Sequence, residues 1–254
     1  MNPATPELSI IIPAYDEERR LPETLRRIRA YLEARQMTAE VIVVDDGSGD
    51  ATAAIVETWR VEFPALRLLS NGRNRGKGYS VRHGMLAAHG RQALFTDADL
   101  SAPIEEADKL LAALACGERS RTSRYDVAIG SRAVDRSLIE IHQSPLRELA
   151  GIVFNWFVRA ITGVSFVDTQ CGFKAFVCKR ARIVFEQQRI ERFGFDPEIL
   201  FLARRHGLRA VEIPVRWAHD PSTKVHVVLD GLRMLADLFR IRWHWLLGHY
   251  PKAE

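Results

Sequence analysis

The stretch EVIVVDDGSGDATAAIVETW (40–59) contains the pattern that decides the fold. An apolar run predicts a buried strand at 40–44, an acidic turn with glycine follows at 45–50, and helical spacing continues over 51–63. The same order recurs along the N-terminal half, with strands expected at 8–12, 66–70 and in ALFTDADL (93–100), and helices at 21–35 and 78–90. Strands that alternate with helices predict an α/β domain with a parallel sheet and right-handed crossovers.

The second half of the chain is less regular. Helices are expected at 106–115, 146–163, 195–207 and about 227–247, strands at 126–132 and 211–217, and a loop at 133–147. In a parallel sheet, ligands collect at the carboxyl ends of the strands. Polar clusters follow three of the predicted strands, namely AYDEE (14–18), DDGSGD (45–50) and TDADLS (96–101).

The composition is that of an ordinary soluble globular protein. The chain has 254 residues, of which 47% are hydrophobic and 27% charged, and a net charge of +4. The three cysteines have neither metal-ligand spacing nor a disulfide framework, so a reducing compartment is expected. We expect no signal peptide and no membrane span. The arginines are dispersed, which argues against a nucleic-acid-binding role.

Asp97 and Asp99 form a pair of carboxylates directly after the apolar run ALFT. Alternate residues of an extended chain point the same way, so both side chains can converge on one cation, and hard oxygen ligands favour Mg²⁺ or Mn²⁺. Such a cation can bridge a nucleotide diphosphate and neutralise the charge that develops as it leaves. Ser101 can add a hydroxyl ligand. The alternative is a solvated turn that caps the following helix.

Two other segments carry candidate ligand-binding residues. Asp45 and Asp46 directly follow a buried strand, where they can accept hydrogen bonds from a base or a ribose. RNRGKGYSVRHG (73–84) is not a Walker A phosphate loop, but Arg75, Lys77 and its glycines can approach a ligand closely. The alternative for this second segment is an exposed basic turn.

Taken together, these segments resemble the inverting glycosyltransferases of family 2 over almost the whole chain. Within that family the sequence is most similar to the dolichyl-phosphate β-glucosyltransferase branch of polyprenyl-phosphate sugar synthases, and more distantly to dolichyl-phosphate mannose synthases. The marks are IIPAYDEERRLPETL (11–25), EVIVVDDGSGDAT (40–52), NRGKGYSVRHG (74–84), TDADLSAP (96–103), GSRA (130–133), DTQCGFKAF (168–176), ERFGFDPEILFLA (191–203) and STKV (222–225).

The resemblance implies a GT-A-type fold, in which one α/β domain has a Rossmann-like, mostly parallel sheet flanked by helices. The catalytic domain is expected at 1–225, followed by a C-terminal amphipathic helix at 226–254. The implied reaction moves glucose from UDP-glucose to a polyprenyl phosphate and gives a β-linked product. The alternatives are another donor such as GDP-mannose, a hydroxyl acceptor, or a non-catalytic nucleotide-binding module.

The resemblance also implies three overlapping sets of site residues. Those expected to bind the nucleotide sugar are Pro13, Tyr15, Glu17, Asp45 or Asp46, Lys77, Asp97, Arg216, Ser222 and Lys224. Those expected to hold Mg²⁺ or Mn²⁺ are Asp97, Asp99 and Ser101, the last of which stands where mannose synthases carry Gln. Those expected to take part in the transfer are Asp97, Asp99, Arg132, Arg147, Asp196 and Glu198. The insertion of Thr223 departs from the GSK pattern of the family.

The residue types fit a phosphate acceptor. A phosphate is anionic at pH 7 and needs cationic positioning, which Arg132 and Arg147 can supply, rather than a general base. A hydroxyl acceptor would require a carboxylate base, for which Asp196 or Glu198 would be the candidate.

A lipid-linked acceptor also implies contact with a membrane. The helix expected near 227–247 combines one apolar face with arginines and tryptophans, as interfacial helices do, and the helix at 146–163 is a second candidate. The sequence therefore predicts a cytoplasmic protein attached peripherally to the cytoplasmic face of a membrane. The alternative is that the C-terminal helix packs on the catalytic core.

Overall fold

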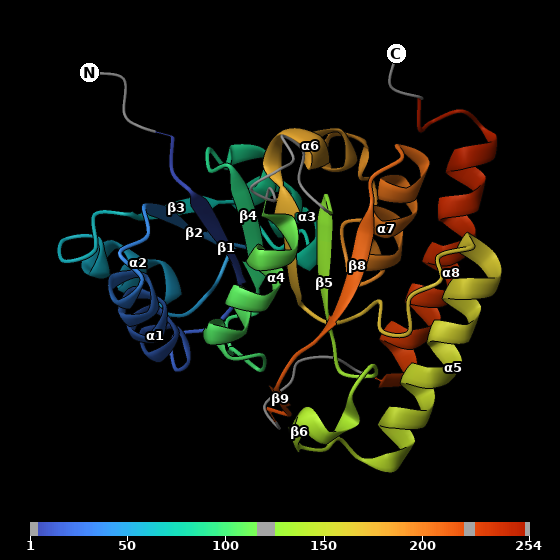
Figure 1. Cartoon of the computed structure of the whole chain (residues 1–254), viewed down its shortest axis with the longest axis horizontal. Helices are drawn as coiled ribbons and strands as arrows, with labels where there is room; N and C mark the ends of the chain where they lie inside the picture. Colours follow the sequence, from blue (N-terminus) through green and yellow to red (C-terminus); the bar gives the residue numbers. More distant parts are fainter. Residues whose placement is uncertain (1–4, 116–124, 221–226, 252–254) are drawn as a thin grey trace.

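Parallel strands with apolar side chains on both faces form the centre of the molecule. The computed structural model describes residues 5–115, 125–220 and 227–251. In these residues one sheet has the strand order β3-β2-β1-β4-β7-β5-β8 (Figure 1). Its strands are β1 (Leu8–Ala14), β2 (Ala39–Asp45), β3 (Leu66–Ser70), β4 (Gln92–Thr96), β5 (Val127–Ser131), β7 (Phe173–Val177) and β8 (Ala210–Pro214). Strands β1 to β4 are mutually parallel, as predicted.

Helices cover both faces of this sheet, which confirms the predicted α/β class. One face packs against α1 (Leu21–Ala34), α2 (Thr52–Trp59) and α4 (Ala107–Leu114). The other face packs against α3 (Lys77–Ala87), α6 (Cys178–Gln187) and α7 (Phe195–Arg205). In α1 the apolar residues Leu21, Leu25 and Ile28 are buried because their spacing places them on one side of the helix.

Two long helices stand side by side beyond α7, at the right of Figure 1. They are α5 (Pro145–Thr162) and α8 (Val227–Leu246). Leu238 and Ile241 of α8 are buried in the same core as α7, so the C-terminal helix packs on the catalytic fold. Its limits agree with the expected range of about 227–247. In the described parts of the chain, no helix is both long enough and apolar enough to span a bilayer.

One antiparallel strand in the middle of the sheet was not predicted from the sequence. β7 lies between β4 and β5 and is antiparallel to both, and α6 follows it directly. The predicted strand at 211–217 is divided, because β8 ends at Pro214 and β9 (Trp217–Ala218) belongs to a separate two-stranded sheet with β6 (Ile139–Ile141). The predicted loop at 133–147 therefore contains β6 and a short 3₁₀ helix at Arg136–Leu138.

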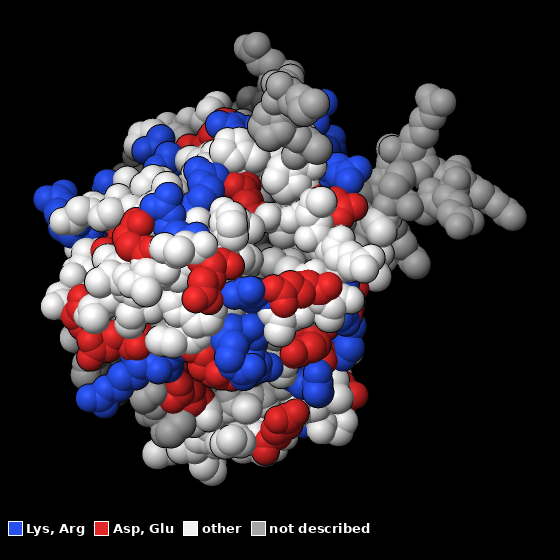
Figure 2. Space-filling view, turned by 90° about the vertical axis from the view of Figure 1, so that its left-hand side faces the viewer, with Lys and Arg blue, Asp and Glu red and all other residues white. Residues whose placement is uncertain are grey.

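The surface over α1 and α2 mixes both signs of charge. Figure 2 shows this side of the molecule, where basic and acidic side chains alternate. Pairs one helical turn apart account for much of the pattern, namely Arg26–Glu23, Arg29–Glu33 and Arg60–Glu57. Exposed pairs of this kind add little stability. Because both signs of charge are mixed on this face, it does not indicate a strongly charged binding partner.

Candidate active site

A cavity of about 370 Å³ lies at the carboxyl ends of β1 and β4, and we call it the sheet-edge cavity. Because parallel strands end at the same edge, residues far apart in sequence meet there. Six of the residues expected to bind a nucleotide sugar line it, namely Pro13, Tyr15, Glu17, Asp46, Lys77 and Asp97, together with Asp99. The pocket has the size of an ordinary small-molecule site.

The two carboxylates after β4 share this cavity with a lysine. Lys77 Nζ lies 2.5 Å from Asp97 Oδ1. Burial would lower the pKa of Lys77, but the charges of Asp97 and Asp196 outweigh burial and raise it. Burial and the neighbouring charge of Asp97 raise the pKa of Asp99. The cavity thus holds an acidic pair whose repulsion Lys77 reduces only in part.

This donor set fits a divalent cation that shares its ligands with a substrate. In the described residues no cluster of three His, Cys, Asp or Glu side chains forms a closed metal site. Mg²⁺ does not need one, because it is often held by one or two carboxylates together with substrate phosphates. Asp97 and Asp99 supply that pair. Ser101 does not line the cavity, and its backbone N–H donates to Asp99 Oδ1 over 2.9 Å.

Asp46 holds the loop that carries Lys77. Its Oδ1 accepts hydrogen bonds from Asn71 Nδ2 and the Arg75 N–H, and its Oδ2 accepts one from the Gly76 N–H at 2.7 Å. Gly76 has a φ of 108°, which only glycine adopts readily. Asp45 is buried outside the cavity lining and accepts a bond from the Ser48 N–H. The two adjacent acids therefore shape turns at the end of β2.

Two residues that the sequence reading did not single out also line the sheet-edge cavity. They are Arg192 and Phe193, from the ERFGF segment. This segment lies against the start of α3, where the Tyr79 N–H donates to the Glu191 carbonyl oxygen at 2.9 Å. The signal in the sequence was that both residues lie in ERFGFDPEILFLA (191–203), one of the marks of the resemblance.

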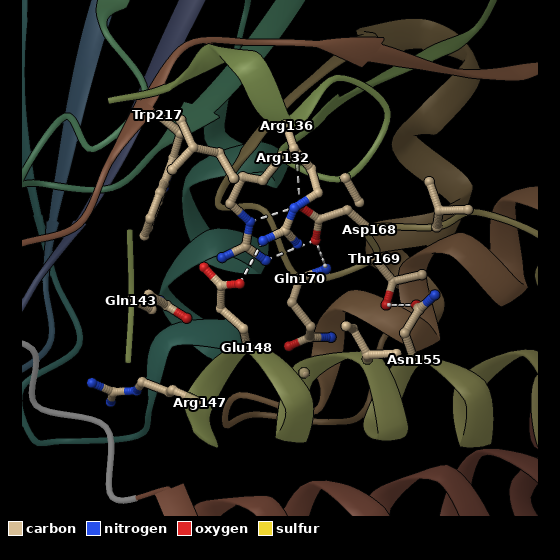
Figure 3. Close-up of a pocket in the computed structure, with 15 residues that line it drawn as sticks. Arg132, Arg136, Gln143, Arg147, Glu148, Asn155, Asp168, Thr169, Gln170 and Trp217 are labelled. Atoms are coloured by element: carbon tan, nitrogen blue, oxygen red, sulfur yellow. Dashed lines mark hydrogen bonds and ion pairs between the residues drawn. The ribbon is translucent and has the colours of Figure 1, made fainter. Parts of the chain in front are cut away.

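A second cavity, of about 120 Å³, contains several arginines, and we call it the arginine cavity (Figure 3). The predicted pair Arg132 and Arg147 lines it, and so do Arg136 and Trp217. Arg147 and Glu148 come from α5, whereas Arg132 follows β5. The structure therefore brings the two predicted acceptor arginines to one cavity and adds a third.

Arg132 is held by a bidentate ion pair with Asp168. Its Nε and Nη2 donate to the carboxylate over 2.6 and 2.8 Å, and its backbone N–H donates over 3.0 Å. Burial would raise the pKa of Asp168, but the charge and hydrogen bonds of Arg132 outweigh burial and lower it to about 2. The Arg132 guanidinium also lies 5.3 Å from the Trp217 ring centroid. Its Nη1 has no partner among the described residues and can receive an anion.

The segment 168–172 connects the two cavities. At one end Asp168 fixes Arg132, and at the other Gly172 lies against Asp97. A Cβ atom on Gly172 would fall 2.1 Å from Asp97 Oδ2, so only glycine permits this approach. The motif DTQCGFK therefore sets the position of the acidic pair relative to the arginine cavity.

The structure places the remaining predicted residues away from open ligand space. Asp196 is buried and accepts a 2.5 Å hydrogen bond from the buried Lys174. Glu198 is fully buried and accepts from Tyr250 Oη and two backbone N–H groups. Arg216 is paired with Glu106 and lines neither cavity. Ser222 and Lys224 lie outside the described residues.

Comparison with known families identifies the family of this chain. Residues 9–167 match the model of the family "Glycosyl transferase family 2". The chain belongs to this family. The predicted membership and the predicted fold are both confirmed, and the protein is a family 2 glycosyltransferase.

Curated relatives align with almost the whole chain. The "Dolichyl-phosphate beta-glucosyltransferase" of Drosophila melanogaster is 40% identical over 98% of this chain and 78% of its own length. The proteins of the same name from Saccharomyces cerevisiae and Homo sapiens are 35% and 32% identical, over 96% of this chain and 76% and 77% of their own lengths.

Among solved structures, the glucosyl-3-phosphoglycerate synthase of Mycobacterium tuberculosis has a similar fold. Its complex with Mn²⁺, uridine diphosphate and glucosyl-3-phosphoglycerate matches with a TM-score of 0.62 at 16% identity, covering 99% of this chain and 82% of that one. A second complex of that enzyme contains Mg²⁺ and uridine diphosphate.

Proposed function

We propose that this protein transfers glucose from UDP-glucose to a polyprenyl phosphate such as dolichyl phosphate, with inversion to a β-linked product. The observation that carries the proposal is the segment 168–172, which joins an acidic cavity suited to a metal and nucleotide diphosphate to a cavity suited to a phosphate. The names of the relatives support the acceptor and the sugar, and the solved complexes of the mycobacterial enzyme support uridine diphosphate with Mn²⁺ or Mg²⁺.

In the donor half of the site, Asp97 and Asp99 would hold the cation against the diphosphate. When bound, the cation supplies positive charge to the leaving nucleotide diphosphate. Lys77 already carries one positive charge to this position. Tyr15 and Glu17 line the same cavity along the β1 end, where the nucleoside can lie.

In the acceptor half, Arg132 presents a guanidinium that Asp168 holds in place, so the acceptor phosphate meets an oriented cation. A hydroxyl acceptor would need a carboxylate base, and the environments of the candidate carboxylates do not suit that role, which favours a phosphate acceptor. Asp196 is engaged by Lys174, and Glu198 accepts three hydrogen bonds away from both cavities. Glu148 does line the arginine cavity, but hydrogen bonds from His142 and Arg136 lower its pKa, which makes it a poor base.

The test is release of nucleotide from a panel of UDP- and GDP-sugars with Mn²⁺ or Mg²⁺, in the presence and absence of a short polyprenyl phosphate. We expect UDP release from UDP-glucose that depends on both the metal and the lipid phosphate, and that Asp97→Ala abolishes. Release that ignores the lipid phosphate, or that occurs only with another donor, would refute the assignment. No release from any donor would favour a nucleotide-binding module without catalysis.

We further propose that the protein attaches peripherally to the cytoplasmic face of a membrane, through α5 and α8 together. Each helix has a stripe of exposed apolar side chains, and the two helices are neighbours (Figure 1). Arg233 and Arg240 expose more than half of their side chains on α8. Apolar side chains flanked by arginines fit a bilayer that contains anionic lipids. The stripes consist of Leu146, Leu149, Ile152, Val153 and Trp156 on α5, and Leu229, Leu232, Phe239, Trp243 and Leu246 on α8.

Flotation with anionic liposomes tests this attachment. We expect the wild-type protein to float, and the double variant Trp156→Ser, Trp243→Ser to remain at the bottom of the gradient. Val61→Ser is the matched control, since Val61 is 84% exposed outside both stripes. Wild-type protein that stays at the bottom would refute the attachment.

A further inference from the structure

One polar side chain in the arginine cavity has a buried hydrogen-bond donor that lacks an acceptor. Gln170 lines this cavity, and its Nε2 atom is buried without a hydrogen-bond partner in the described part of the chain. A buried amide N–H group that lacks an acceptor destabilises a protein, so an orphan of this kind calls for an explanation. A ligand that enters the cavity with an oxygen acceptor would supply the missing partner once the Gln170 side chain turns toward it.

The two carboxylates of this cavity and the amide oxygen of Asn155 are already engaged (Figure 3). The Asp168 carboxylate receives Arg132 and the backbone N–H of Gln170 itself. Asn155 Oδ1 accepts from Thr169 Oγ1 over 3.1 Å. The remaining carboxylate in the lining, Glu148, is paired with Arg136 and His142. The cavity therefore offers several donors while both of its carboxylates are engaged by cationic side chains, which is an arrangement that suits an anion.

The position of Gln170 along the chain adds a second reason. Its backbone is fixed two residues earlier by Asp168, which binds Arg132, and two residues later by Gly172, which contacts Asp97. A ligand group that binds the Gln170 amide would therefore lie at a fixed position relative to both Arg132 and the acidic pair. The backbone of this segment is itself anchored, because Glu212 of β8 accepts from the Asp168 N–H at 2.7 Å.

We propose that the Gln170 side-chain amide donates a hydrogen bond to a phosphate oxygen of the acceptor, beside the Arg132 guanidinium. The inference rests on the proposed function, in which the acceptor is a polyprenyl phosphate. A neutral donor is suited to this place, because it orients the phosphate without withdrawing as much charge from the attacking oxygen as another cation would. Gln170 is then an acceptor-binding residue of the transfer.

The experiment compares Gln170→Leu and Gln170→Glu with the wild type in steady-state kinetics, varying the short polyprenyl phosphate and UDP-glucose separately. Loss of a hydrogen bond to a charged group raises KM for the lipid phosphate by about 10-fold or more in Gln170→Leu. A carboxylate facing the phosphate in Gln170→Glu raises it further. We expect KM for UDP-glucose to stay within about twofold in both variants, and Gln187→Leu, outside both cavities, to change neither constant.

Inhibition by inorganic phosphate identifies which part of the acceptor is contacted. Competition against the lipid phosphate should weaken in Gln170→Leu if the amide binds the phosphate group, and unchanged competition would overturn the inference. Equal increases in both KM values, or a lower melting temperature with unchanged KM values, would also overturn it. Gln170→Asn, which keeps a shortened amide, provides a second variant if Gln170→Leu does not fold, and is expected to retain part of the affinity.

The wild type separates this inference from the proposed function. A wild-type protein that does not use the lipid phosphate refutes the proposed function and the inference with it. A wild-type protein that uses it, with Gln170 variants that bind it equally well, refutes the inference alone.

Discussion

Replacing Gly172 by alanine is expected to lower the activity of the enzyme about 100-fold while leaving it folded. The added Cβ would lie 2.1 Å from Asp97 Oδ2, whereas ordinary contacts begin at 3.4 Å, so the carboxylate must withdraw by about 1.3 Å. The atom that must move is the end of a side chain, and the φ of Gly172 lies outside the left-handed region. The free energy of unfolding should therefore change by less than about 1 kcal/mol.

Activity should respond far more strongly than stability. A displacement of about 1 Å in a catalytic group can cost about 100-fold in rate, which corresponds to about 2.7 kcal/mol of transition-state stabilisation. The same movement would break the pair between Asp97 and Lys77. The assay is kcat/KM for UDP release from UDP-glucose with Mn²⁺ and a polyprenyl phosphate, alongside urea unfolding.

Gly231→Ala is the matched control. Gly231 lies on α8, and no neighbouring segment among the described residues comes within 4 Å of the place that its added methyl group would take. This variant should keep wild-type activity, and its stability should stay the same or rise, because alanine favours a helix over glycine by about 1 kcal/mol. A Gly172→Ala enzyme with wild-type kcat/KM would refute the reasoning, since Asp97 could then move freely without consequence. A large loss of stability would also contradict it, since that would mean the backbone moves instead.

Four other outcomes are expected. Asp168→Asn should lose about 2 kcal/mol of stability at pH 7, because the pKa of this carboxyl is about 2 in the folded protein and 3.8 ordinarily. The contribution is present above about pH 4 and disappears as the pH falls toward 2. The free energy of unfolding in urea should therefore depend less on pH between about 2.5 and 7 in the variant than in the wild type. Lys174→Met leaves the buried Asp196 carboxylate unpaired and should cost about 3–5 kcal/mol in the same unfolding assay, with wild-type stability as the contradicting result. Tyr250→Phe removes a donor from buried Glu198 and should cost about 1.5–3 kcal/mol by thermal or urea unfolding; no change would mean that this bond adds nothing. A chelator should abolish UDP release, and added Mn²⁺ should restore it; activity that survives chelation would exclude a dependence on the metal.

The N-terminal half of the fold could be predicted because its signals are local. Each strand from β1 to β4 is an apolar run, and each is followed by a helix with its own spacing, so pattern alone gives the order and the parallel direction. FKAFV (173–177) is a short run that Lys174 interrupts, so its pattern alone does not mark it as a strand. Its antiparallel place between β4 and β5 depends on partners distant in sequence, which local periodicity does not encode.

Part of the candidate site was predictable from the motifs, whose residues follow strands or begin helices. Asp97 and Lys77 share the sheet-edge cavity, and Arg132 and Arg147 share the arginine cavity, as the motifs indicated. Glu198 belongs to the motif FDPEIL but faces the core, because on a helix buried on all sides an acid within a motif can serve packing as well as chemistry. On such a helix the spacing of apolar residues predicts neither the direction in which an acidic side chain points nor its burial.

The other differences arise from contacts between distant segments. Arg136 and Gln170 enter the arginine cavity because α5, β9 and the segment before β7 converge there. Arg192 reaches the sheet-edge cavity because its segment packs on the start of α3. Such convergence is a property of the tertiary structure, and no single stretch of sequence carries it.

The central position of β7 has a consequence for the order in which the molecule is assembled. Thr96 at the end of β4 pairs with Phe173, far along the chain, and in the described sheet β5 joins β4 only through β7. During synthesis, β4 must therefore wait with an unpaired edge until residues 173–177 emerge from the ribosome, and unpaired edges invite aggregation. Such non-local pairing is slow to form. Because the same insertion carries Gly172 against Asp97, catalytic competence should appear only after this step of folding.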